Sequence, residues 1–106
     1  MALIQGPTTV SSSEVTVATE KSGRRINVKS IRVRSGESSN ATVTFRDGTG
    51  GTTLFVIPCP PGGVAGIVFA DDAHELGRLL TAGNALTAQA GAAATTLTVE
   101  VEFGRV

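Results

Sequence analysis

The chain has 106 residues, of which 41% are hydrophobic and 17% are charged. This is enough for one domain with a buried core, and it excludes an intrinsically disordered protein. The nine basic and nine acidic side chains cancel, so the overall charge does not point to nucleic acid or to an anionic membrane as a direct partner. We therefore expect a single domain over residues 1–106.

The first residues, about 1–9, are expected to form an extended arm. They lack the basic and apolar regions of a signal peptide, so we do not expect one here. No apolar run approaches the roughly 20 residues that a transmembrane helix needs. The only cysteine, Cys59, cannot form an internal disulfide, which favours assembly in a reducing cytoplasm.

After this arm the dominant pattern is an alternation of hydrophobic and polar residues, which is typical of strands with one buried face. It predicts a strand at residues 14–17 and a longer one between Arg24 and Ser35. Along the longer strand the hydrophobic residues change from even to odd positions. One extra residue near Lys29 or Ser30 would absorb this change, so we expect a β-bulge there, or a strand that changes sheets.

The same alternation predicts a strand at residues 41–46, and the glycine-rich segment 47–51 that follows is typical of a hairpin turn. Residues 53–57 and 64–69 are continuous apolar runs. Such runs suit strands that are covered on both faces, by a second sheet or by a neighbouring subunit. Three prolines among residues 58–61 remove backbone donors, so this segment is expected to be an extended connector and not part of a central strand.

Residues 71–80 contain the only helical pattern, at most one short turn that Asp71 or Asp72 could cap. A weaker strand pattern at residues 86–90 and a strong alternation at residues 97–103 complete the chain. Seven or eight short antiparallel strands separated by glycine-rich turns predict an all-β fold, a β-sandwich of the jelly-roll kind.

The densest group of reactive side chains lies at residues 71–75, Asp-Asp-Ala-His-Glu. Its spacing matches neither a calcium-binding loop nor a zinc motif, so we interpret it as a solvated acidic loop and expect no metal. A nucleophile–base pair could be drawn from Cys59 and His74, but Cys59 lies between prolines with no basic neighbour to lower its pKa. No Gly-x-Ser-x-Gly motif is present. We therefore expect no enzyme active site and no cofactor.

Two other features could suggest a binding site, a glycine-rich turn and the aromatic residues, and neither fits one. The turn Gly48-Thr49-Gly50-Gly51 lacks the lysine and the following helix of a phosphate-binding loop, so a hairpin turn is the expected structure. The chain has no Trp and no Tyr, and its four Phe residues lie in apolar strand patterns that indicate a core position. This argues against an aromatic face that binds glycans or single-stranded nucleic acid.

The charged residues are segregated along the chain. Basic side chains predominate in residues 1–46 and acidic ones in residues 47–106. Two interpretations have similar weight: a solvated sheet face that discourages edge pairing, or a docking surface that meets the acidic half of a neighbouring copy or an acidic partner. A nucleic-acid patch is a third, which the zero net charge and the absence of Trp and Tyr weaken. The basic stretch consists of Lys21, Arg24, Arg25, Lys29, Arg32 and Arg34.

Four segments carry a resemblance to a known group of proteins. They are VKSIRVR at residues 28–34, NATVTFRDG at 40–48, GNAL at 83–86 and TTLTVEVEF at 95–103. In this order they resemble small β-sandwich virion proteins of tailed bacteriophages. In that group an "I-x-V" strand leads into "A-T-V-x-hydrophobic-x-D-G", and a later "G-N-A-L" precedes a final strand rich in Thr and Val.

The resemblance implies a structural protein of the virion: a capsid decoration (cement) protein, or a head or tail accessory protein, that stabilises the shell by binding the major capsid protein. It implies a jelly-roll-like homo-oligomer, for which a trimer is expected, in a virion assembled in the bacterial cytoplasm. The alternatives are a receptor- or glycan-binding module associated with the tail or a fibre, and a small hydrolase or isomerase on a β-barrel. The expected docking residues, besides the N-terminal arm, are Arg24, Arg25, Arg32 and Arg34.

Overall fold

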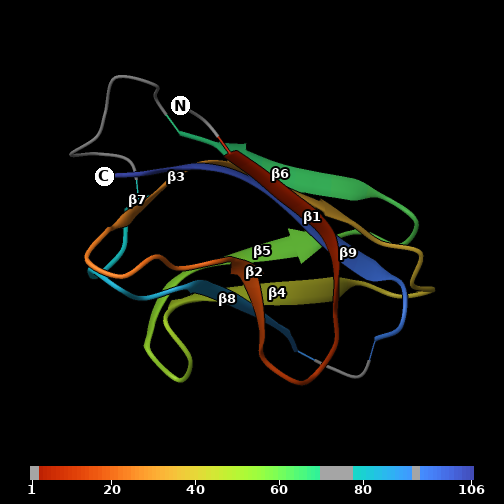
Figure 1. Ribbon diagram of the computed structural model, residues 1–106. Coiled ribbons are helices and arrows are strands. Elements are labelled where there is room, and N and C mark those ends of the chain that lie inside the picture. The colour runs from red at the N-terminus through yellow and green to blue at the C-terminus, as the bar shows by residue number, and fades with distance from the viewer. Residues whose placement is uncertain (1–2, 70–77, 92–93) are drawn as a thin grey trace.

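The polypeptide forms two antiparallel β-sheets that pack face to face in a sandwich (Figure 1). The computed structural model describes residues 3–69, 78–91 and 94–106. The first sheet has the strand order β1-β9-β3-β6, with β7 also paired to β3, and the second has the order β2-β8-β4-β5. This confirms the predicted antiparallel β-sandwich. The strands of the described residues are β1 (Leu3–Val10), β2 (Val15–Ala18), β3 (Ile26–Arg34), β4 (Ala41–Asp47), β5 (Thr52–Cys59), β6 (Val64–Val68), β7 (Arg78–Leu79), β8 (Leu86–Ala90) and β9 (Leu97–Arg105).

The core lies between the two sheets and is built by the alternating residues that the sequence indicated. Strand β9 lies between β1 and β3, and its hydrophobic residues are buried while Glu100 and Glu102 lie on the opposite face. Phe45 and Phe103 are fully buried, and Phe55 and Phe69 pack against the same core. Each fully buried apolar side chain of this size contributes about 1.5–3 kcal/mol to folding.

Strand β3 contains the irregularity that its hydrophobic pattern predicted. Its register with β9 shifts between Val28 and Ser30, which confirms a β-bulge at this position. Because of the extra residue, Ile31 and Val33 point into the core, as Ile26 and Val28 do before the bulge. The residues that alternate with them after the bulge therefore point away from the core.

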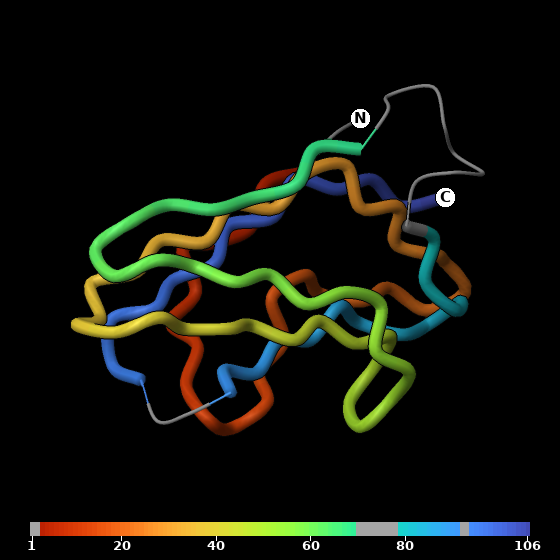
Figure 2. The backbone as a smooth tube through the Cα atoms, turned by 180° about the vertical axis from the view of Figure 1, so that it is seen from behind, coloured from red at the N-terminus to blue at the C-terminus, as the bar shows by residue number. Residues whose placement is uncertain are grey.

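Strands β5 and β6 are the edge strands on one side of the sandwich, where they run side by side (Figure 2). The prediction that both faces of these strands are covered is wrong within one chain, because each strand is covered only on its inner face, by the opposite sheet. Val56, Val64 and Val68 are 51%, 57% and 83% exposed. Cover by a neighbouring subunit stays a prediction.

The segment of residues 58–61 is not wholly a connector, because strand β5 continues through Pro58 to Cys59. An edge strand accommodates a proline, since one side of its backbone has no hydrogen-bonding partner to lose. The expectation that these prolines avoid a central strand is thus met, but the assignment as a connector is wrong at its first two residues.

Two segments differ from the sequence-based expectation in their secondary structure. Residues expected to form an extended arm form, from Leu3, the edge strand β1, which pairs with β9 and shifts register between Gln5 and Thr8. Arg78–Leu79 form strand β7, so the helical pattern of residues 71–80 does not extend to its end. Residues 71–77, with the acidic group 71–75, lie outside the described residues. Within the described ranges no helix has the length and hydropathy to cross a membrane.

Candidate docking surfaces

The glycine-rich turn between β4 and β5 holds an anion, and that anion is the protein's own carboxylate. The backbone N–H of Gly50 donates to both carboxylate oxygens of Glu14, at 3.0 and 3.1 Å, and the Thr87 hydroxyl donates to the same carboxylate. These donors, with the hydroxyl of Thr87 as the largest cause, hold the pKa of Glu14 below its ordinary value. The turn is therefore a hairpin that is fixed to the β1–β2 connection.

Like Glu14, Glu37 and Asp47 accept hydrogen bonds from backbone and hydroxyl donors of other loops. The Glu37 carboxylate accepts bonds from the Thr96 hydroxyl and from the backbone N–H groups of Thr96 and Thr95, and these lower its pKa. Asp47 accepts from the Thr81 backbone N–H at 3.1 Å and from the Thr81 hydroxyl at 2.9 Å. These acidic side chains fix loops and leave little acceptor capacity for a ligand.

The lowered pKa values predict a loss of stability in acid. A carboxyl whose pKa is lower in the folded state stabilises the fold above its unfolded pKa, and this stabilisation is lost as the pH falls through the folded value. We therefore expect Glu37→Gln to lower the thermal midpoint at neutral pH, and to match the wild type well below pH 4.5, the ordinary value of a glutamate. Thermal melts at the two pH values, followed by circular dichroism, test this. An equal difference at both would contradict it.

Cys59 is unsuited to nucleophilic chemistry in this fold. Its side chain is 1% exposed, and burial raises the pKa of the thiol. Its Sγ lies 3.6 Å from the carbonyl oxygen of Gly63. The predicted partner His74 lies outside the described residues, as does the acidic group around it. In the part of the chain that the structure describes, no three His, Cys, Asp or Glu side chains are grouped as metal ligands.

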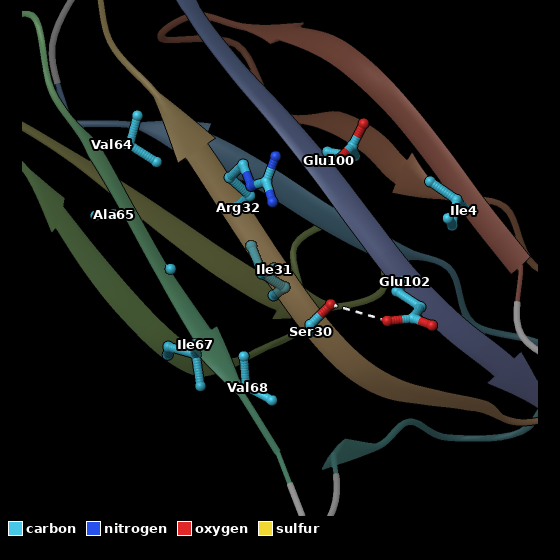
Figure 3. Close-up of a pocket in the computed structure, with 11 residues that line it drawn as sticks. Ile4, Ser30, Ile31, Arg32, Val64, Ala65, Ile67, Val68, Glu100 and Glu102 are labelled. Carbon is cyan, nitrogen blue, oxygen red and sulfur yellow. Dashed lines mark hydrogen bonds between the residues drawn. The ribbon is translucent and has the colours of Figure 1, made fainter. Parts of the chain in front are cut away.

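One broad charged and apolar surface is formed by the outward side chains of the sheet β1-β9-β3-β6, and we call it the outer face. Strands β9 and β3 at its centre supply charges of opposite sign, and strands β1 and β6 at its borders supply exposed hydrophobic residues (Figure 3). Its members are Ile4, Pro7, Ser30, Arg32, Arg34, Val64, Gly66, Val68, Thr98, Glu100 and Glu102.

Arg32 and Arg34 have exposed side chains on the outer face, and neither guanidinium group has a hydrogen bond or an ion pair among the described residues. Arg32 is the cross-strand neighbour of Glu100. At the next pair of β3 and β9 residues on the same face, the Ser30 hydroxyl donates to Glu102 Oε1 at 3.3 Å. The guanidinium groups are thus free, within the described part of the chain, to meet a carboxylate of another molecule.

A hollow of about 420 Å³ lies in the outer face and is lined by residues of all four strands, from Ile4 on β1 to Gly66 on β6. A Cβ at Gly66 would overlap the carbonyl oxygen of Ile31, so only glycine lets β6 approach β3 this closely. We expect Gly66→Ala to lower the free energy of unfolding by about 1–3 kcal/mol, because β6 must move away from β3. Urea unfolding would measure this, with Ala65→Gly as a control for β6. A G66A variant as stable as the wild type would show that the close approach is not required.

The other two predicted docking residues lie at the opposite end of β3 and contact the chain itself. The guanidinium of Arg24 donates to the carbonyl oxygen of Arg105 at 2.9 Å, and Arg25 Nε donates to the Leu80 carbonyl oxygen at 2.7 Å. Arg24, Lys21 and Arg105 surround a hollow of about 280 Å³ together with Leu3. We call these three cations the basic end.

The structure therefore separates the four predicted arginines into two sets. At about 3.3 Å per residue along a strand, Ile26 and Arg32 lie about 20 Å apart on β3, and Arg24 and Arg25 precede Ile26. The exposed hydrophobic residues of the outer face were missed by the sequence analysis, although the apolar run 64–69 already contained the signal in Val64 and Val68.

Comparison with known proteins gives a result for the fold alone. No protein-family model and no curated protein matches the sequence. Among solved structures, the fold is similar to that of a chain in the virus-like particle of extra small virus from the giant freshwater prawn Macrobrachium rosenbergii, with a TM-score of 0.50 and 12% sequence identity. The similarity covers 99% of the present chain and 75% of the other. The chain thus has the sandwich fold of a protein found in a viral shell.

Proposed function

We propose that the protein is a structural, non-enzymatic component of a virion: a capsid decoration (cement) protein of a tailed phage that stabilises the shell by binding coat subunits. The observation that carries this proposal is the fold itself, which is shared over 99% of the chain with a chain of a virus-like particle. The sequence resemblance to phage virion proteins supplies the phage assignment and the place of assembly, the bacterial cytoplasm.

The proposed contact with the coat protein is the basic end. Lys21 and Arg24 are exposed, and the lining of their hollow contains no acidic residue among those described. Such a cluster favours an acidic patch on the partner, because complementary charges speed association and reject partners of the wrong sign. Arg105 is held in place here, since it donates to the Thr19 carbonyl oxygen at 2.8 Å and lies over the ring of Phe103.

The outer face with Arg32 and Arg34 is a second proposed docking surface. A shell presents many copies of each coat subunit, so an assembly of several linked copies of this chain binds more tightly than one copy with the same contacts. The two surfaces lie apart on the molecule, and one can hold the coat protein while the other holds a neighbouring subunit. Reversal of the charge at Arg32 and Arg34 is therefore expected to weaken assembly on the shell and to leave the fold intact.

The test is cosedimentation of the purified chain with empty shells assembled from the coat protein of the source phage. We expect the wild type to sediment with the shells and the double variant Lys21→Glu/Arg24→Glu to lose at least about tenfold in affinity. The control is Ser38→Glu/Ser39→Glu, which adds negative charge in an exposed loop at the opposite end of β3. A wild type that stays in the supernatant, or a control that loses as much as the basic-end variant, would contradict the proposal.

A further inference from the structure

We infer that the outer face binds a second copy of this chain, face to face, about a two-fold axis that runs parallel to the strands between β3 and β9. This inference deepens the proposed function, because it names the partner of one surface of the assembly subunit. It rests on the order of side chains across the sheet and on their charge.

The register of the sheet sorts the outer face into rows that run across the four strands. In the central row, Gly66 lies beside Arg32 and Arg32 lies beside Glu100. The β1 position next to Glu100 is taken by the irregular segment between Gln5 and Thr8. A neighbouring row consists of Val68, Ser30, Glu102 and Ile4 in that order.

A two-fold axis between β3 and β9 lays each strand over a different strand of the second copy. Strand β3 faces β9 of the second copy, and β6 faces β1, while every residue keeps its own row. Arg32 then faces Glu100 of the second copy, and by symmetry Glu100 faces Arg32 of the second copy. Each dimer would thus contain two such pairs of opposite charge, and like charges are not brought together in this row.

The shapes and the exposed hydrophobic side chains agree with this arrangement. Val68 and Ile4, 83% and 70% exposed, would lie opposite each other and remove two large apolar side chains from water. Gly66, which has no side chain, would lie opposite the irregular segment of β1, where Pro7 is exposed on the outer face. The position without a side chain in one copy therefore faces the exposed proline ring of the other.

A second copy fits this surface better than an acidic or a basic partner. Arg32 and Arg34 are balanced by Glu100 and Glu102 on the same face, so a partner of a single sign would meet as many like charges as opposite ones. Four strands about 4.8 Å apart and five residues of about 3.4 Å give a face of roughly 19 by 17 Å. Two such faces bury roughly 650 Å² in total, which is below the about 1,200–2,000 Å² of a standard specific interface, so we expect a weak dimer that dissociates on dilution.

The test is sedimentation equilibrium of the purified full chain over a wide concentration range, without coat protein. We expect a mass that rises with concentration from the 10.8 kDa of one chain towards twice that value. The single variants Arg32→Glu and Glu100→Arg should each weaken the dimer at least about tenfold, because both central pairs become repulsive. An equimolar mixture of the two variants should dimerise again, because each charge then meets its opposite across the axis.

The mixture separates an interface from a merely structural role, since mixing two variants does not change the fold of either. Lys21→Glu, a reversal of the same sign at the basic end, is the matched control and should not alter the mass. A monomer at every concentration, a mass of three chains, or a mixture that stays monomeric would overturn the inference. None of these results would change the outcome of the shell-binding test of the basic end. A protein that dimerises but does not bind shells would overturn the proposed function and leave the dimer inference intact.

Discussion

Replacing Phe45 by alanine is expected to lower the free energy of unfolding by about 3–5 kcal/mol, a large part of the 5–15 kcal/mol typical of a whole domain. Phe45 is 0% exposed on β4, and its ring centroid lies 5.1 Å from that of Phe55. The substitution therefore removes buried apolar surface, leaves a cavity between the sheets and ends an aromatic contact.

Urea unfolding at neutral pH, followed by far-UV circular dichroism, would measure this loss. The matched control is Val56→Ala on the neighbouring strand β5, where the side chain is 51% exposed. Its effect should stay within about 0.5 kcal/mol, as is usual for surface positions. Similar losses for the two variants would show that the space between the sheets is not the core that stabilises the fold.

Replacing Gly51 by asparagine is expected to lower the free energy of unfolding by about 2–3 kcal/mol, although the residue lies in a surface turn. A Cβ at Gly51 would overlap the carbonyl oxygen of Asp47, whose carboxylate also holds Thr81 and Asn84. The side chain therefore forces the β4–β5 turn open and disturbs the loop that packs on it.

The neighbouring residue gives a sharp control for this prediction. Gly50 has a φ of 68° with nothing within 4 Å of its would-be Cβ, and asparagine tolerates this left-handed conformation. Gly50→Asn should therefore cost less than about 1 kcal/mol. Thermal and urea unfolding of both variants would measure the difference, and equal losses would refute the steric explanation.

The strands were predictable from the sequence because alternation reports the burial of each strand's own two faces. The bulge in β3 was predictable for the same reason, since an extra residue changes the phase of the pattern. Strand β1 was missed because Gly6 and Pro7 interrupt its alternation, and β7 because its two residues are held only by pairing with Asn27 and Val28.

The candidate surfaces were predictable only in part, because they depend on which strands are neighbours. The sequence placed Arg32 and Arg34 on one face, but it could not show that Glu100 lies beside Arg32 and Gly66 on its other side. That arrangement follows from pairing between segments far apart in the chain. The basic end was missed as a unit for the same reason, since Arg105 meets Lys21 and Arg24 only in the folded protein.

The central position of β9 has a consequence for how the protein is made. Its neighbours β1 and β3 leave the ribosome long before it does. Strand β3 can pair earlier with β6 and β7, but among the described strands β1 pairs in this sheet with β9 alone, so it waits until residues 97–105 have been synthesised. Until then β1 and one edge of β3 stay unpaired and open to other nascent chains. This sheet is therefore completed only when its central strand has been made, and its long-range pairing makes folding slow compared with that of a helical protein of equal length.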